Sequence, residues 1–562
     1  MAVPKKKVSK ARRDKRRSAN SKMAAPEMVK CPKCGEYNLT HRVSRIGGYY
    51  KGEELLAKPP DCPPPTPAAM PRGSFCLFIH VRRHTFSLTP PKNFESKTMA
   101  IQLSDHFTYR KLIRFVLPTS AMMIFTSIYG VVDGLFVSNF IGKTPFAAIN
   151  LIMPFIMILG GMGFMIGTGG TALVTKIMGQ GDGERANRTF SLCILFTVAL
   201  GAVLTVVGVT CTRPIARLLG ASDAMMGNCV HYGRIVIAFT VPFMLQSVFQ
   251  SFLAAAEKPK LGFLVTVAAG CTNAALDALF IVGFRWGLAG AALATGIGQC
   301  VGGVIPVFYF LKERKNCRLR LCHPSCEFRQ LLTICTNGSS ELMNNVSASL
   351  VSMLYNFVLM ERIGEDGVSA YGVLMYVQFI FVALEVGYSV GAAPIVGYHY
   401  GAENRGELRN VLLKSLLLMG VAGVCLAGLA ELLAVPLAHL FVGYDAGLYA
   451  LTVHAFRIFS FSFLLAGINI YISGFFTALN NGGVSALIAF LRTLVFQSAS
   501  VLLLPLLFGV DGIWWAIAAA EVFAFAVSLT PVLPSPGNGT DIAERIKQKP
   551  ARAQVPRRIF TE

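Results

Sequence analysis

Long apolar runs alternate with short polar loops along most of the chain after residue 99. Each run is long enough to cross a bilayer, because a hydrocarbon core of about 30 Å needs about 20 helical residues. The pattern predicts an all-α polytopic membrane protein with twelve transmembrane helices. The predicted spans are 112–140, 146–176, 189–211, 231–253, 261–284, 288–311, 331–360, 368–397, 411–441, 452–477, 484–508 and 512–534.

The loops between the runs alternate between rich and poor in positive charge. The poor set has isolated cations such as Lys143, Arg285 and Arg362. The rich set contains Lys176, Arg185, Arg188, Lys258, Lys260, Lys312, Arg314, Lys315, Arg318, Arg320, Arg329, Arg405, Arg409 and Lys414. Because basic loops stay on the cytoplasmic side, an even number of spans predicts that both termini are cytoplasmic.

Composition supports a membrane protein and argues against a polynucleotide-binding one. Of the 562 residues, 53% are hydrophobic and 15% are charged, and the net charge of +22 lies largely in the loops and the first sixty residues. Loop cations orient helices, so no DNA partner is expected. The 14 cysteines lack the paired spacing of a disulfide scaffold. Cys317, Cys322, His323 and Cys326 share one basic loop, but their spacing fits no standard zinc site.

Residues 1–58 are polar and basic, unlike the rest of the chain. They begin MAVPKKKVSKARRDKRRSAN and continue with CPKCG and HRVSRIGGYYKGEEL. The order of these pieces resembles the family of bacterial large-subunit ribosomal protein number thirty-two, a basic arm with a zinc ribbon. The resemblance implies a partner in ribosomal RNA; the alternative is a solvated basic tail. Ser44 and Gly47 stand where that family has a second Cys pair, so Cys31 and Cys34 form half of a zinc site and no metal is expected.

A proline-rich stretch, 59–98, separates this segment from the apolar runs, and we expect it to be a disordered linker. Met99 opens a passage that looks like a natural start for the membrane protein. The chain is therefore either a fusion of two proteins or an artefactual fusion of two adjacent reading frames.

Repeated motifs in the membrane region predict two related halves, 99–322 and 323–535, followed by a cytoplasmic tail over 536–562. MGQGDGERANRTF at 178–190 echoes YHYGAENRGELRN at 398–410, and GLAGAALAT at 287–295 echoes GVDGIWWAI at 509–517. Repeats of six spans are typical of transporters that rock one bundle against its copy. The alternative is a duplicated structural bundle without transport.

Acids inside the apolar runs are candidates for a coupling site, because a charge in the bilayer is costly unless it has a function or a partner. Tyr129 and Asp133 are four residues apart, as are Asn273 and Asp277, so each pair shares one helix face. Carboxylate, amide and hydroxyl oxygens suit a hard cation, and two neighbouring acids suit proton exchange. The alternative for each acid is a buried group satisfied by a neighbouring helix.

Several segments between about 108 and 535 together resemble the multidrug and toxic compound extrusion (MATE) family. They are FVLPTSAMMIFTSIYGVVDGLFVSNFIG, GFMIGTGGTALVTKIMGQGDGERANR, AAAEKPKLGF, TNAALDALFIVGFRWGLAGAALAT and APIVGYHYGAENRGELRNVL. The resemblance implies two six-helix lobes, a central cavity open to one side at a time, and export of organic cations driven by protons or sodium. It also implies that the family's cation site corresponds to Tyr129, Asp133, Asn273, Asp277 and Thr295.

The second half carries fewer matching residues. Met353 stands at the place that corresponds to Asp133, so coupling is expected in the first lobe. Glu385, Arg457, Arg492 and Glu521 lie in other spans without an assigned role. Glu341 could attract a cationic drug, or Arg457 could be its structural partner. The residues predicted to line the drug cavity, with plain packing as the alternative, are Met122, Phe125, Met153, Phe243, Gln246 and Glu341.

The leading hypothesis is a secondary active antiporter of a bacterial cytoplasmic membrane. A flippase for lipid-linked saccharides is the alternative within the superfamily, and a ribosomal component is the alternative suggested by residues 1–58. No nucleophile and base stand together, so we predict no enzyme. No GxxxxGK[ST] motif occurs in the membrane region, so we predict no ATP drive and no cofactor besides the coupling ion.

Overall fold

The computed structural model describes residues 101–141, 143–221, 223–312, 317–324 and 327–531, together with four short strands near the N-terminus. The chain divides into two units, Met1–Phe94 and Glu95–Glu562. In the first unit, β1 (Met28–Lys30) pairs antiparallel with β2 (Tyr37–Leu39), and β3 (Tyr49–Tyr50) pairs antiparallel with β4 (Glu53–Glu54). The predictions for Cys31, Cys34, the linker at 59–98, Cys326 and the tail at 536–562 lie outside the described residues.

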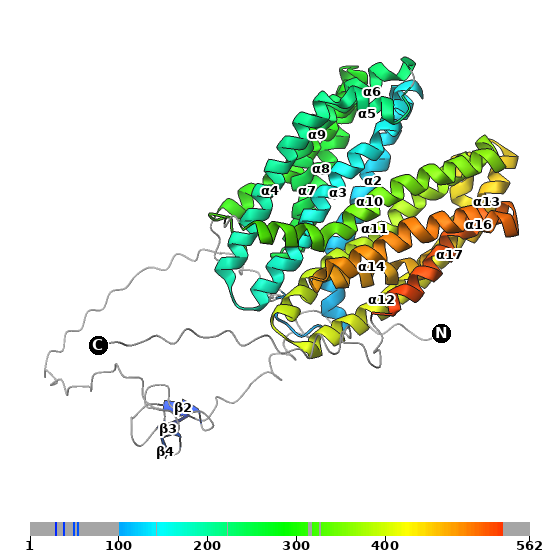
Figure 1. The fold of residues 1–562 in the computed structure, drawn as a ribbon. Coiled ribbons are helices and arrows are strands. Elements are labelled where there is room, and N and C mark those ends of the chain that lie inside the picture. Colours follow the sequence, from blue (N-terminus) through cyan, green and yellow to red (C-terminus); the bar gives the residue numbers. More distant parts are fainter. Residues whose placement is uncertain are drawn as a thin grey trace, which may run out of the picture. The chain divides into compact units, whose positions relative to one another are not determined.

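The described part of the second unit has helices as its regular elements and consists of two lobes (Figure 1). The helices of the first lobe are α2 (Tyr109–Phe140), α3 (Lys143–Gly179), α4 (Gly183–Thr210), α5 (Thr212–Leu218), α6 (Asp223–Ala238), α7 (Thr240–Ala255), α8 (Pro259–Asp277), the π-helix η1 (Ala278–Gly283) and α9 (Gly287–Leu311).

The second lobe repeats this order after a loop that the structure describes over 317–324. Its helices are α10 (Phe328–Arg362), α11 (Glu365–Gly401), α12 (Arg405–Val442), α13 (Ala446–Ser460), α14 (Phe463–Ala478), α15 (Gly482–Phe490), the π-helix η2 (Leu491–Phe496), α16 (Gln497–Phe508) and α17 (Val510–Leu529).

The predicted all-α membrane architecture is confirmed. Ten helices among the described residues are long and apolar enough to span a bilayer, and counting two bent pairs gives up to twelve. The predicted spans 231–253 and 452–477 correspond to these pairs, α6 with α7 and α13 with α14, which bend by 55° and 48°. The apolar pattern gives no sign of these bends, which occur where a tight turn interrupts the helical hydrogen bonds. In those turns Phe239 N donates to Val236 O, and Ser462 N donates to Phe459 O.

The internal repeat extends to the caps and turns of the helices. Asp182 accepts a hydrogen bond from Arg185 N at the start of α4, and Asn404 accepts one from Glu407 N at the start of α12. Gly287 and Gly509, which precede or begin the last helix of each lobe, both adopt positive φ, at 56° and 60°. The matched sequence segments therefore fold in the same way in the two lobes.

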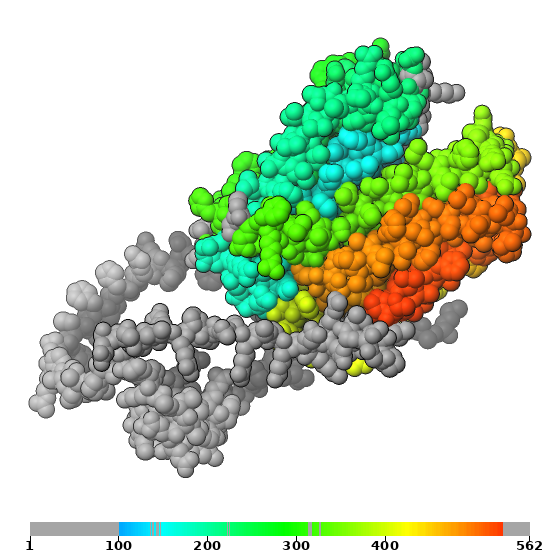
Figure 2. All heavy atoms as spheres, viewed as in Figure 1, coloured from blue at the N-terminus to red at the C-terminus, as the bar shows by residue number. Residues whose placement is uncertain are grey.

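The lobes touch at one end of the bundle. We call it the basic end, because basic residues lie in or beside its turns at 180–182, 256–258 and 402–404 and its loop at 317–324. There, Asn480 Nδ2 of the second lobe donates to Ala172 O on α3 at 3.1 Å. Lys176 Nζ lies 5.2 Å from the centre of the Tyr400 ring. Towards the opposite end the lobes diverge, and Figure 2 shows an open hollow between them, the interlobe cleft.

Each lobe has its own apolar core. Phe190, Phe249, Phe252 and Phe310 pack in the first lobe, and Tyr355, Phe456 and Trp514 pack in the second. Large apolar side chains also cover the outside, for example Leu432 and Leu507, which are 77% and 75% exposed. Such a surface is stable in lipid, so the apolar exterior follows from a multi-span membrane protein.

Candidate functional site

Three helices of the first lobe, α2, α8 and α9, contribute side chains to one buried polar group. Asp133 lies in the half of α2 that is distant from the basic end, and Tyr129 lies one turn before it. Asn273 and Asp277 lie on the last turns of α8, immediately before the π-helical turn η1. Thr295 projects from α9, and its hydroxyl donates to Ala291 O at 3.0 Å.

The acids predicted from helical spacing lie close together in the structure. The Asp133 carboxyl group interacts with the side chains of Asp277, Asn273 and Thr295. Asp277 is fully buried and Asn273 is 3% exposed. The fold therefore places two carboxyl groups, one amide and one hydroxyl around a common point in the lobe interior.

The polar atoms of this group are not satisfied by one another. Asp133 Oδ1, both carboxyl oxygens of Asp277 and Asn273 Nδ2 are buried, and none has a hydrogen bond of ordinary geometry within the described part of the chain. Unpaired buried oxygens of this kind are able to take up protons or to ligate a hard cation.

Sequence reasoning missed one residue beside this group. Tyr232 on α6 is 2% exposed and interacts with the charges of both Asp133 and Asp277. No sequence neighbour of Tyr232 signals this role, because its partners lie on α2 and α8. A tyrosine within an apolar run was the available hint.

Tyr129 faces Gln246 of α7, one of the residues predicted to line a drug cavity. Gln246 is 5% exposed and Met122 is 2% exposed. Both line a small internal cavity of the first lobe, together with Gln250 and Thr266. Phe125, Met153 and Phe243 are half-buried.

The second lobe contains a separate buried group of charges. The Arg492 guanidinium on η2 binds the Glu521 carboxylate on α17, with Nε 2.9 and 3.0 Å from its two oxygens and a further nitrogen at 2.8 Å. Asn469 Nδ2 donates to Glu521 Oε2 at 2.7 Å. Glu385 and Glu341 also interact with the Arg492 charge.

The predicted alternative in which Arg457 partners Glu341 is not what the structure shows. Arg457 on α13 is exposed, and Arg492 supplies the positive charge near Glu341. Met353, at the place that corresponds to Asp133, is 57% exposed. The two lobes therefore carry different polar groups in the membrane.

The cysteines of the loop between the lobes make local contacts. Cys317 Sγ donates to Leu319 O at 3.1 Å, and Ser191 Oγ lies 3.7 Å from Cys322 Sγ. Within the described residues, no three His, Cys, Asp or Glu side chains are grouped so as to hold a metal ion.

Comparison with protein families identifies both parts of the chain. The MatE family profile matches twice, at residues 118–279 and 342–500, which together exceed half of the chain. The profile of the Ribosomal L32p protein family matches residues 2–58. The chain is thus a transporter-like region preceded by a ribosomal-protein-like segment.

Curated relatives and solved structures agree with the first of these matches. The chain is 24% identical over 420 residues to multidrug export protein MepA of Staphylococcus aureus (strain MRSA252), covering 74% of this chain and 91% of the relative. It is 23% identical over 419 residues to MepA of Staphylococcus saprophyticus, with the same two coverages.

Among solved structures, a MATE transporter bound to MaL6 and an outward-facing multidrug resistance MATE transporter of the MOP superfamily each superpose with TM-score 0.72. Each is 21% identical in sequence to this chain, and each match covers 77% of this chain and 97% of the chain in the solved structure. These likenesses establish the fold. With two matches to the family profile over more than half of its length, the chain belongs to the MATE family of membrane transporters.

Proposed function

We propose that the protein is a secondary active antiporter that exports organic, often cationic, compounds in exchange for protons or sodium. The observation that carries the proposal is the group of unpaired buried oxygens on Asp133 and Asp277. An uncompensated carboxylate inside a bilayer costs several kcal/mol, so protons or a cation would neutralise these acids. The relatives named multidrug export proteins support an exported drug as the second ligand.

The coupling would work through the equilibrium between two arrangements of the lobes. A ligand shifts such an equilibrium only by binding the two arrangements with different affinity. Because basic loops mark the cytoplasmic side, the basic end would face the cytoplasm, in the cytoplasmic membrane, and the interlobe cleft would open outward. Cation or proton binding at Asp133 and Asp277 would then favour release of the drug to the outside.

The proposed drug path lies in the interlobe cleft. Phe125, Met153 and Phe243 are half-buried and would offer apolar and aromatic surface to the drug, and Glu341 would attract a cationic one. Met122 and Gln246 remain proposed cavity residues, although both lie deep in the first lobe.

Efflux from proteoliposomes under an imposed proton gradient, and then under a sodium gradient, tests the proposal. We expect Asp133→Asn and Asp277→Asn each to abolish ion-driven efflux of a fluorescent cation while binding of that cation persists. Asp223→Asn is the matched control, because Asp223 is exposed at the start of α6 in the same lobe. Efflux by Asp133→Asn at the wild-type rate under both gradients would disprove coupling at this site.

The match of residues 2–58 to the Ribosomal L32p protein family favours a second activity for the N-terminal segment. We propose that this segment contacts ribosomal RNA through its basic residues. Antibodies against the segment and against the membrane region should detect one full-length product that sediments with ribosomes at low salt and dissociates at high salt. A product of the size expected for a start at Met99 would show that the two activities are separate.

A further inference from the structure

Residues 101–108 lead into α2 and form a non-helical segment at the basic end, called the strap here. Leu103 and Phe107 of the strap are both fully buried. They pack in one apolar cluster with residues of the second lobe, including Ile395 on α11 and Val411 on α12. The strap therefore continues into the first helix of one lobe while its apolar side chains are buried in the other.

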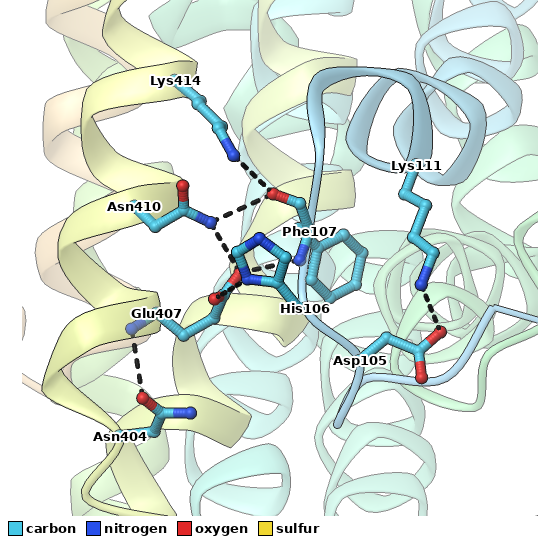
Figure 3. A network of polar contacts seen from close by, with 8 residues as sticks. All are labelled: Asp105, His106, Phe107, Lys111, Asn404, Glu407, Asn410 and Lys414. Carbon is cyan, nitrogen blue, oxygen red and sulfur yellow. Dashed lines mark hydrogen bonds and ion pairs between the residues drawn. The ribbon is translucent and has the colours of Figure 1, made fainter.

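Polar contacts fasten the end of the strap to α12 (Figure 3). Glu407 Oε1 accepts a hydrogen bond from Phe107 N at 2.8 Å, and Glu407 Oε2 lies 2.6 Å from His106 Nδ1. Phe107 O accepts hydrogen bonds from Asn410 Nδ2 at 3.0 Å and from Lys414 Nζ at 2.8 Å. Side chains of the second lobe thus satisfy both backbone polar groups of Phe107, which is the usual condition for burying them.

The start of the strap is fastened to the first lobe. Leu103 N donates to Glu257 Oε1 at 2.7 Å, and Glu257 lies in the turn between α7 and α8. Arg318 Nη1 lies 3.5 Å from Glu257 Oε1, and Arg318 Nη2 donates a hydrogen bond to Gln102 Oε1 at 3.1 Å. The Glu257 side chain is largely shielded from solvent in this contact, since it is 11% exposed.

The two attachments limit how far the lobes are able to separate at this end. Phe107 follows Leu103 by four positions in the chain, and four fully extended steps span about 14 Å at most. Opening the basic end would carry the α7–α8 turn away from the start of α12, so one attachment would have to break. The α12 attachment has more hydrogen bonds and both buried side chains, so the Glu257 contact would be released first.

We propose that the strap is a latch for the basic end, and that Glu257 and Glu407 are positioning residues of the transport cycle. The latch holds the basic end closed while the interlobe cleft is open, and its release permits the opposite arrangement. This proposal rests on the alternating-access function proposed above, but it is independent of which residues bind the coupling ion.

Electron–electron distance measurements on full-length protein in liposomes test the latch. Spin labels would be placed by Glu184→Cys on α4 and Arg409→Cys on α12, after replacement of the 14 native cysteines. Both positions are exposed, and each lies at the start of a helix at the basic end. We expect Glu257→Leu and Glu407→Leu each to raise the ratio of long to short distances about tenfold, as expected for loss of a hydrogen-bonded contact.

Two further variants separate a latch from a general structural role. Glu407→Gln keeps an oxygen that accepts from Phe107 N, so its distances should stay close to those of the parent protein. Glu403→Gln alters an exposed acid in the turn before α12 and should also leave the distances unchanged. Unchanged distances in both leucine variants, or an equal shift in Glu403→Gln, would overturn the proposal. Because distances are read without transport, failure of ion coupling at Asp133 would leave this result interpretable.

Discussion

Gly179 on α3 and Gly401 on α11 each lie against the backbone of the opposite lobe. A Cβ atom at Gly179 would lie 2.0 Å from Tyr398 O, and a Cβ atom at Gly401 would lie 1.9 Å from Lys176 O. Gly401 and Tyr398 occupy the places in the second lobe that Gly179 and Lys176 occupy in the first. The two lobes therefore contact each other at the basic end through equivalent glycine residues. Only a hydrogen atom fits where a Cβ atom would lie at either glycine.

This contact predicts that Gly179→Ala or Gly401→Ala disfavours closure of the basic end. The added methyl group would strike backbone atoms, and overpacking of this kind typically costs about 1–3 kcal/mol. We expect a shift towards the arrangement in which the basic end is open, measured by the spin-label distances described above. Gly428→Ala on α12 is the control, because a Cβ atom there meets nothing within 4 Å. A closed basic end in both alanine variants would contradict the prediction.

Tyr232→Phe is predicted to weaken binding of the coupling ion while both acids, Asp133 and Asp277, are retained. The Tyr232 side chain is buried beside Asp133 and Asp277, so its hydroxyl is placed to assist either acid. Loss of one hydrogen-bonding group is worth about 1 kcal/mol, so we expect the ion concentration for half-maximal efflux to rise several-fold. Tyr444→Phe should leave that concentration unchanged, since Tyr444 is 83% exposed. Equal ion dependence in Tyr232→Phe and the parent would exclude this role.

Arg492→Leu is predicted to destabilise the second lobe strongly. The guanidinium is 13% exposed and its partner Glu521 is 3% exposed, and breaking a buried pair typically costs about 3–5 kcal/mol. Glu341 and Glu385 would lose the same positive charge. We expect a clear fall in the melting temperature of the detergent-solubilised protein.

The matched comparison for Arg492 is Arg457→Leu. Arg457 is an exposed arginine in the same lobe, and its replacement should change the melting temperature little. If the two arginine variants melted at the same temperature, the buried group around Arg492 would have no structural role.

The local features of the site could be predicted from the sequence. Spacings of four residues placed Tyr129 with Asp133 and Asn273 with Asp277, because one helical turn is a local property. Their assembly with Thr295 was implied by family resemblance, and the structure brings Asp133, Asn273, Asp277 and Thr295 together. Tyr232 could not be predicted, since its place depends on how α6 packs beside α2 and α8.

The membrane-spanning character, the two related halves and the family could be predicted from the order of residues, since hydrophobic runs and repeated motifs are properties of neighbouring residues. Which distant groups meet depends on the tertiary structure. His106 contacts Glu407, which lies 301 residues later in the chain. Arg492, for which the sequence suggested no role, forms an ion pair with Glu521. Apolar patterning specifies which face of a helix is buried, but partners across helices and lobes depend on the packing of the whole bundle.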